Sequence, residues 1–235
     1  MELNGNAVTW LGHGTWLWET ADGQRILIDP WLAGNPACPE EWHDPGHLDG
    51  ILITHGHGDH VGDAVETIKR SGATAICNWE VGAWLNGEGC EGIVQMNIGG
   101  TVEVAGITAT MVQAVHSSGI GDPAAAQITG GNPAGYVLHL PNDLTVYHSG
   151  DTDVFGDMAL IAELDPLDVA VLSIGDHFTM GPRRAAKAVE LLKVDRVLGG
   201  HFETFPVLVG RPSQLRELLG PAVEVPDLVP GQRFG

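Results

Sequence analysis

Residues 54–60 read Thr-His-Gly-His-Gly-Asp-His and gather three imidazoles and one carboxylate at the end of an apolar run. Imidazole and carboxylate are ligands that zinc, manganese, iron and nickel accept in proteins. Alternate residues of an extended chain project to the same side, so His55 and His57 can bind one ion together. The turn into a following helix directs Asp59 and His60 as a second pair. The segment therefore predicts part of a metal site.

This segment cannot complete a site for two metal ions, which takes about seven protein ligands besides water. Three further candidates, His116, Asp151 and His201, each follow an apolar run and lie beside small residues. If the strands formed by these runs share one orientation, their ends meet at one edge of the fold. We expect all of these ligands to converge at that edge.

Short apolar runs bounded by glycine, proline and polar turn residues predict a chain rich in short strands. Strands are expected at residues 8–11, 15–19, 26–28, 51–54, 74–76, 93–94, 101–104, 107–115, 135–140, 144–147, 169–174 and 194–198. Helices are expected from Asp59 or Asp63 to about Arg70, from Pro182 to Lys193, and around Ser213 to Leu219. Residues 35–49 and 117–133 are expected to be loops, and long loops in compact domains often carry function. The alternation of strands and helices predicts a layered α/β fold.

The composition limits what the chain can bind. Its 235 residues fit one domain or two closely fused halves, and its formal net charge is −19, from 11 Lys and Arg against 30 Asp and Glu. Such a surface repels nucleic acid and anionic lipid, so we expect no nucleic acid and no membrane as partners. No apolar run approaches the ~20 residues of a membrane-spanning helix, and residues 1–6 show no secretory signal.

The cysteines bear on the compartment. Cys38, Cys77 and Cys90 are irregularly spaced and form no C-x-x-C pair. Unpaired thiols of this kind are typical of a reducing compartment. Together with the missing secretory signal, they predict a cytoplasmic protein.

The order of the candidate ligands along the chain is informative in itself. The motif H-x-H-x-D-H, a later histidine, an aspartate within Ser-Gly-Asp-Thr and a final histidine occur in an order that resembles the metallo-β-lactamase superfamily. The resemblance spans nearly the whole chain. Four stretches, at residues 11–13, 116–118, 177–182 and 201–206, resemble one branch of this superfamily more specifically. That branch contains uncharacterised metal-dependent hydrolases related to L-ascorbate-6-phosphate lactonase.

This resemblance implies a fold and a ligand set. The fold would be a four-layer αββα sandwich, formed by residues 1–235 as a single domain built from two similar halves. The first metal ion would be held by His55, His57 and His116, and the second by Asp59, His60 and His201. Asp151 would bridge the two. The two divalent metal ions would be zinc, or else manganese, nickel or iron, because all of these accept such ligands.

A pair of divalent ions implies hydrolysis. A metal can lower the pKa of bound water to around 7, and the metal-bound hydroxide would attack a carbonyl carbon or a phosphorus. Asp59 could accept the proton as well as bind metal, and His13 or His177 could stabilise the leaving group. These three residues are the catalytic candidates. The expected substrate is a small molecule, namely an anionic ester, lactone or phosphodiester.

Other functions fit part of the pattern. A metal-dependent ribonuclease would use the same ligands, but the chain lacks a basic stripe. A non-catalytic metal-binding or sensor protein is a further alternative, although an idle site need not keep every ligand. A two-iron oxidoreductase is also conceivable, but related flavoproteins usually carry Glu at the position of His57, and no flavin-binding segment is visible. Oligomers occur among the relatives, so the chain could form a homo-oligomer.

Overall fold

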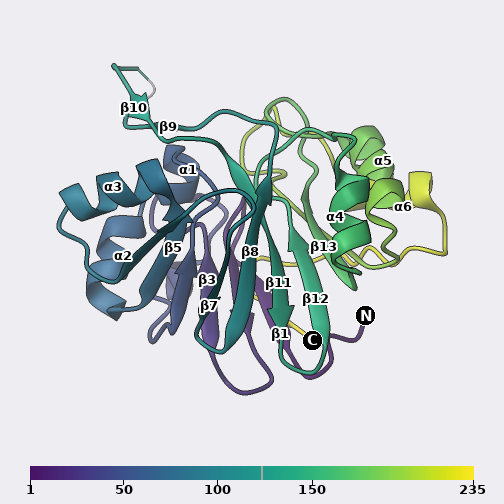
Figure 1. Cartoon of the computed structure of the whole chain (residues 1–235). Helices are drawn as coiled ribbons and strands as arrows, with labels where there is room; N and C mark the ends of the chain where they lie inside the picture. The colour runs from purple at the N-terminus through teal and green to yellow at the C-terminus, as the bar shows by residue number, and fades with distance from the viewer. Residues whose placement is uncertain (123) are drawn as a thin grey trace.

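The computed structural model describes residues 1–122 and 124–235 and contains two large sheets (Figure 1). The first has seven strands in the spatial order β15 (Arg233–Phe234), β1 (Ala7–Trp10), β2 (Trp16–Glu19), β3 (Arg25–Ile28), β4 (Gly50–Leu52), β5 (Thr74–Asn78) and β6 (Ile93–Met96). The second has six, in the order β14 (Val197–Gly200), β13 (Val169–Ser173), β12 (Leu144–His148), β11 (Ala134–Leu140), β8 (Ile107–Gln113) and β7 (Thr101–Val104). A separate hairpin pairs β9 (Gly119–Ile120) with β10 (Ile128–Thr129).

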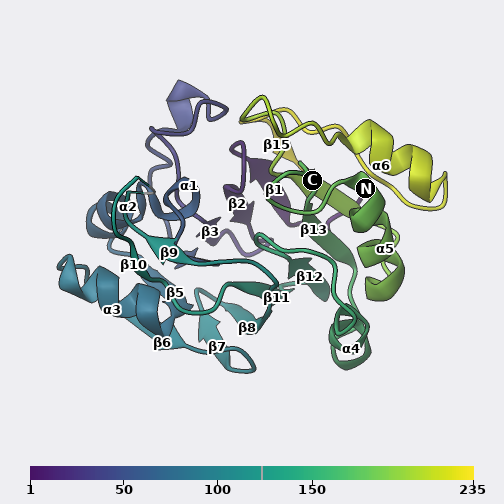
Figure 2. The same cartoon turned by 90° about the horizontal axis from the view of Figure 1, so that it is seen from above.

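Helices lie on the outer sides of the two sheets. The helices beside the first sheet are α1 (Gly58–Val61), α2 (Ala64–Ser71) and α3 (Trp79–Gly87), and those beside the second are α4 (Met158–Leu164), α5 (Pro182–Leu192) and α6 (Pro212–Leu219) (Figures 1 and 2). A 3-10 turn, η1 (Glu40–Trp42), lies within the expected loop 35–49. Within residues 1–122 and 124–235, none of the helices has the length and apolar character needed to cross a membrane.

The two sheets pack face to face because alternate residues of their strands are apolar on the same side. One cluster of buried side chains joins the inner faces and includes Trp16 and Ile28 of the first sheet with Tyr136 and Val146 of the second. The neighbouring strand residues of the first sheet, such as Leu17, point outward into a second buried cluster with α2 and α3. Sheets inside and helices outside form the αββα sandwich, so the predicted α/β fold class is confirmed.

Strand direction decides where the candidate ligands lie. β3, β4 and β5 are parallel neighbours in the first sheet. In the second sheet β12, β13 and β14 are parallel. β8 runs in the same direction, because it is antiparallel to β11, which is itself antiparallel to β12. The carboxyl ends of these strands therefore lie together at one edge of each sheet, the edge that is seen from above in Figure 2.

Besides η1, β9 and β10, which lie within expected loops, the elements α3, α4 and β15 were not expected from the sequence. α3 follows β5 without a break, and the side chain of Asn78 caps its start by accepting a hydrogen bond from the amide of Val81 at 2.8 Å. α4 has only seven residues, and two of its apolar side chains, Leu160 and Leu164, are exposed. β15 is a two-residue edge strand that pairs with β1.

The helix expected to begin at Asp59 or Asp63 is divided in two. α1 ends at Val61 and α2 begins at Ala64, with Asp63 between them at the N-cap position. The Asp63 carboxylate makes no capping bond; it accepts a hydrogen bond from the amide of Leu32 instead. The expected loop 117–133 contains the β9–β10 hairpin, and Pro123 in that loop lies outside the described residues.

Removing the hydroxyl group should affect stability differently at the two tyrosines of the chain. The buried hydroxyl of Tyr136 donates to the carbonyl of Ile53 at 2.8 Å, whereas the buried hydroxyl of Tyr147 has no hydrogen-bond partner among the described residues. Removing a buried donor that satisfies a carbonyl costs about 1–2 kcal/mol, and removing an unpaired hydroxyl costs nothing. We expect Tyr136→Phe to lower the free energy of unfolding in urea by that amount and Tyr147→Phe to leave it unchanged or raise it. Equal losses would contradict this bonding pattern.

Candidate metal centre

Three histidines form the first group of potential ligands. His55 and His57 follow β4, and His116 follows β8 of the other sheet. One ligand atom from each lies within 4.8 Å of the other two. His55 Nε2 and His57 Nδ1 are 3.0 Å apart. The predicted first ligand set is thus brought together from the two sheets.

Four residues form the second group: His13, Asp59, His60 and His201, with ligand atoms again within 4.8 Å of one another. Asp59 and His60 lie in α1, whereas His201 follows β14. His13 was predicted to act on the leaving group rather than to belong here. Its Nε2 lies 2.9 Å from Asp59 Oδ2, and its ring packs on that of His201 with a centroid distance of 3.7 Å.

Asp151 lies between the two groups. Its Oδ2 is 3.0 Å from His201 Nε2, 3.3 Å from His60 Nε2 and 3.7 Å from His116 Nε2. Its other oxygen, Oδ1, accepts a hydrogen bond from the hydroxyl of Ser173 at 3.1 Å. A single carboxylate oxygen therefore faces both groups of histidines.

These spacings fit a divalent metal ion. Two ligands bound tetrahedrally to one zinc at about 2.1 Å lie about 3.4 Å apart, which is close to the separations found here. The Nε2 atoms of His60 and His201 are buried and face Asp151 Oδ2, but neither makes a hydrogen bond of good geometry with any of the described residues. Buried polar atoms are normally satisfied, so two such nitrogens aimed at one carboxylate indicate a place where a cation could bind. The donor set of nitrogen and oxygen suits zinc, manganese, iron or nickel.

The protonation states of the first group favour metal binding. Burial lowers the pKa of His55 well below its usual value, and it also lowers the pKa values of His57 and His116. A neutral imidazole keeps the lone pair with which it binds a metal. These three rings are therefore ready to act as ligands.

His60 differs from the three histidines of the first group, because neighbouring carboxylates favour its charged form. Burial disfavours its charged form, but Asp151 and Asp29 outweigh this effect and raise its pKa well above the usual value. Burial likewise disfavours the carboxylate of Asp151, yet His201 and His60 hold its pKa well below the usual range. A proton on His60 thus balances the two carboxylates in the absence of metal. An incoming cation has to displace that proton.

Asp29 is a functional residue that the sequence interpretation missed. It follows β3 and is fully buried. One oxygen accepts from the amide of Thr54 at 2.7 Å, and the other accepts from the Thr54 hydroxyl at 2.6 Å and from His60 Nδ1 at 2.8 Å. Because the Thr54 hydroxyl donates to Asp29, its oxygen accepts from His55 Nδ1 at 3.0 Å. Asp29 therefore leaves Nε2 of both His55 and His60 free for a metal.

Two glycines permit close packing at the site, one against a candidate ligand and one against the hairpin. A Cβ at Gly14 would lie 2.5 Å from His60 Cε1, and one at Gly56 would lie 2.5 Å from Ile120 Cγ1 in the hairpin. The Ser118 hydroxyl accepts from the amide of Gly56 at 3.0 Å and donates to the carbonyl of Gly130 at 2.9 Å. The β9–β10 hairpin is thereby fixed to the segment between His55 and His57, and Figure 1 shows it projecting beyond the sheets at this edge.

The two predicted leaving-group residues lie in different surroundings. His13 is buried, burial lowers its pKa to about 4 despite the hydrogen bond with Asp59, and it does not line the cavity described below. His177 is exposed, has a positive φ of 60°, and packs edge-on against Phe178. His13 contacts Asp59 and is placed to orient its carboxylate, and the predicted action of His13 on the leaving group stays a prediction. A role for His177 stays a prediction.

A cavity of about 530 Å³ opens beside the two groups. His57, Asp59, His116 and Asp151 lie on its walls, and Phe178 is among its other lining residues. Of the residues that the structure describes, no lysine or arginine lines this cavity. A volume of this size accommodates a small-molecule substrate.

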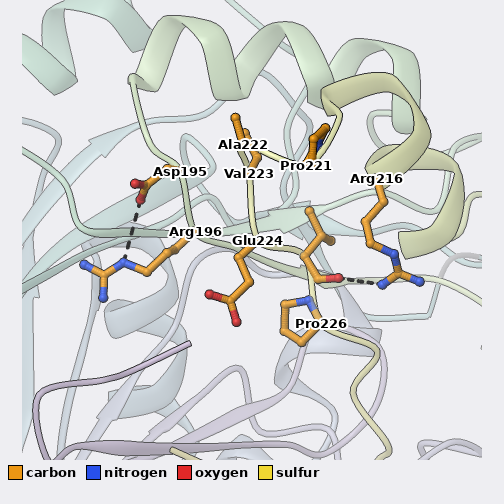
Figure 3. A pocket seen from close by; sticks show the side chains of 9 residues that line it. Asp195, Arg196, Arg216, Pro221, Ala222, Val223, Glu224 and Pro226 are labelled. Carbon is orange, nitrogen blue, oxygen red and sulfur yellow. Dashed lines mark hydrogen bonds and ion pairs between the residues drawn. The ribbon is translucent and has the colours of Figure 1, made fainter.

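Another hollow, of about 670 Å³, lies over the segment between residues 195 and 226 (Figure 3). Its two arginines are already paired, Arg196 with Asp168 at 3.1 Å and Arg216 with Asp227 at 2.7 Å. None of the predicted ligands is among the described residues that line it. It therefore offers neither an unpaired cation nor the candidate chemistry.

Known proteins resemble this chain over most of its length. Residues 24–202 match the family described as the Beta-lactamase superfamily domain. A metal-dependent hydrolase of Koribacter versatilis is 49% identical over 234 residues, which cover 100% of both chains. A metal-dependent hydrolase of Methanopyrus kandleri is 46% identical over 230 residues, covering 97% of this chain and 98% of that protein.

Among solved structures, a metallo hydrolase from the hyperthermophilic archaeon Ignicoccus hospitalis superposes with a TM-score of 0.85 at 32% identity, covering 97% of each chain. The segment that matches the family contains every predicted ligand from His55 to His201, and it leaves out His13. The finer likeness to L-ascorbate-6-phosphate lactonase stays a prediction.

Asp29→Asn tests the carboxylate behind the ligands. An amide cannot accept all three hydrogen bonds, so the orientation of His55 and His60 is lost, and loss of such a supporting partner weakens metal binding about 10–100-fold. Equilibrium dialysis followed by metal analysis measures this effect. Asp49→Asn is the matched control, because Asp49 also accepts a backbone hydrogen bond, from Arg25 at 2.8 Å. Unchanged metal affinity in Asp29→Asn would show that Asp29 does not support the ligands.

The titration of His148 should make the stability of the metal-free protein depend on pH. Burial lowers its pKa from 6.5 to about 4. The unfolded chain therefore takes up a proton below about pH 6.5 that the folded chain refuses until about pH 4, so stability falls as the pH falls through this window. Between pH 7.5 and 5 the loss due to His148 amounts to about 2 kcal/mol. We expect urea titrations to show a correspondingly smaller loss in His148→Gln, and an identical loss would refute the assignment.

Proposed function

The chain belongs to the beta-lactamase superfamily and is a metal-dependent hydrolase, and we propose that it works with two divalent ions bound by the predicted ligands. The substrate in this proposal is a small ester, lactone or phosphodiester. His55, His57 and His116 would hold one ion, Asp59, His60 and His201 would hold the other, and Asp151 would contribute to both.

The position of Asp151 is the observation that carries this proposal. Its Oδ2 lies within 3.7 Å of ring nitrogens from both groups. A site for a single ion would need only one of these groups. They share no residue, and within each the ligand atoms lie within 4.8 Å of one another, which supports a dinuclear centre; a third set of atoms, from Asp29, His55 and His60, is equally close.

A bound divalent ion supplies Lewis acidity and lowers the pKa of the water that it binds. The residues of the chain position that water and receive its proton. Asp59 lines the cavity with 30% of its side chain exposed. Burial disfavours its charge, but the hydrogen bond with His13 lowers its pKa below the usual value and keeps it a carboxylate. Asp59 is therefore placed to accept a hydrogen bond, and then a proton, from an attacking water.

The charge of the site bears on the substrate. The ligand set comprises five neutral imidazoles and two carboxylates, so two divalent ions leave two positive charges in excess. Ions bound there would supply positive charge that favours an anionic reacting group. The ligand residues that line the cavity would hold this charge where a small substrate can reach it.

The same features favour a small molecule over nucleic acid. Ribonuclease activity needs contacts to several phosphates, and the net charge of −19 together with the absence of lysine and arginine from the described cavity lining opposes them.

The three cysteines are buried and free, which suits a reducing compartment, and we place the protein in the cytoplasm on that ground.

Metal content and turnover, measured on the same preparations, test the proposal. We expect two ions per chain at saturation and hydrolysis of at least one substrate in a panel of esters, lactones and phosphodiesters. His57→Ala and Asp151→Ala should lower turnover by about a hundredfold or more. His47→Ala is the matched control, because this histidine lies in a loop with 73% of its side chain exposed.

Different outcomes contradict different parts of the proposal. One ion per chain at saturating metal would remove the dinuclear centre. Two ions without hydrolysis of any panel member would remove the proposed substrate classes. Turnover that survives in Asp151→Ala at the level of His47→Ala would locate the chemistry elsewhere.

A further inference from the structure

The cavity extends from the potential ligands to two phenylalanines. Phe178 and Phe205 line it together with His57 and Asp59. The two phenylalanines come from the loops that follow the neighbouring parallel strands β13 and β14. A hydrogen bond of 3.0 Å from the amide of Gly210 to the carbonyl of Gly175 ties these loops to each other. Part of the cavity wall is therefore apolar and fixed to the sheet.

Phe178 is held in an exposed position by its loop. It is 53% exposed, although it is large and apolar. Its amide donates to the carbonyl of Asp176 at 2.7 Å, and Met180, which is fully buried, donates to the carbonyl of Thr152 at 3.2 Å. Asp176 and His177 both adopt positive φ, 68° and 60°. Left-handed conformations cost about 1 kcal/mol or more in such residues, and strain of this kind gathers at functional sites.

Phe205 forms a second apolar surface of the cavity. Its ring packs edge-on against His13 at a centroid distance of 5.4 Å and lies 6.0 Å from that of Trp31. Its carbonyl accepts a hydrogen bond from the amide of Leu208 at 2.9 Å, and Leu208 is buried. The ring therefore has a defined position between the buried histidine and the open cavity.

The cavity lacks a counterion for an anionic group placed away from the metal centre. No lysine or arginine lines it within the described residues. Arg211 follows the Phe205 loop but pairs with Glu203 at 2.6 Å, and Arg184, after the Phe178 loop, pairs with Asp153. Burying an unpaired charge against apolar walls is costly, whereas burying apolar surface there is favourable.

On the basis of the proposed hydrolysis, we propose that the substrate carries a neutral, apolar substituent beside the bond that is cleaved, and that Phe178 and Phe205 bind it. The reacting group lies at the metal ligands, and the substituent covers the exposed face of Phe178. The two phenylalanines are thus specificity-determining residues. They select among small molecules by apolar contact rather than by charge.

The test uses the metal-loaded full chain with three substrates of the bond class that it hydrolyses, differing only in a hydrogen, a phenyl or a carboxylate substituent. For a lactone these are γ-butyrolactone and its γ-phenyl and γ-carboxy derivatives. We expect the phenyl compound to have the highest kcat/KM, by about tenfold over the unsubstituted one. Phe178→Ala and Phe205→Ala should each remove most of this advantage, measured as the ratio of kcat/KM for the phenyl compound to kcat/KM for the unsubstituted one. Trp79→Ala is the matched control, since Trp79 is an aromatic residue 58% exposed on α3 and not part of the described cavity lining.

A binding measurement separates this inference from the proposed function. Saturation-transfer NMR with 4-phenyl-2-butanone and 2-butanone, neither of which is an ester, reports contact without turnover. Signal from the phenyl ring that is present in wild type and Trp79→Ala but lost in both phenylalanine variants supports the apolar site, even if no substrate is hydrolysed. Equal signal in all four proteins overturns it. A preference for the carboxylate compound, or a phenyl preference that both variants keep, also overturns it and leaves the hydrolase proposal intact.

Discussion

The carboxylate of Asp29 binds Thr54 and His60 at once, deep inside the protein. Through these hydrogen bonds the end of β3 fixes the start of the ligand segment and the ring of His60 in the same place. His60 Nε2 then faces Asp151, which belongs to the other sheet. The relative position of the candidate ligands from the two sheets therefore depends on Asp29, which need not bind a metal ion itself. A buried carboxylate is stable there because each of its oxygens accepts hydrogen bonds.

The packing of the sheets turns this local arrangement into a site. Each sheet alone presents only part of the ligand set at its edge, the first with His55 and His57, the second with His116, Asp151 and His201. The shared apolar core fixes the distance between the two edges, and Tyr136 adds a hydrogen bond from the second sheet to Ile53, directly before the ligand segment. The packing of the core therefore also determines the spacing of the candidate ligands. A change in how the sheets stack would alter the distances at Asp151 first.

The sequence predicted the architecture better than its supporting details. Strong apolar runs and their order along the chain were enough for a layered α/β fold, and the resemblance to a known superfamily implied the αββα sandwich. The candidate ligands were found because histidine and aspartate at strand ends are unusual. Asp29 looked like an ordinary turn residue before a proline, because its partners Thr54 and His60 are 25 and 31 residues further along the chain. α4 was missed because exposed Leu160 and Leu164 blur the helical pattern of apolar residues. The roles of the predicted ligands and of His177 stay predictions, since sequence order carries no information on metal content.

The hydroxyl of Ser118 connects the ligand segment to the β9–β10 hairpin by two hydrogen bonds. On one side lies Gly56, between the candidate ligands His55 and His57; on the other lies Gly130, at the base of the β9–β10 hairpin. Because both hydrogen bonds lie at that base, the tip of the hairpin can change in length and composition without breaking them. Substrate preference and metal chemistry could in this way diverge independently among proteins that share this architecture.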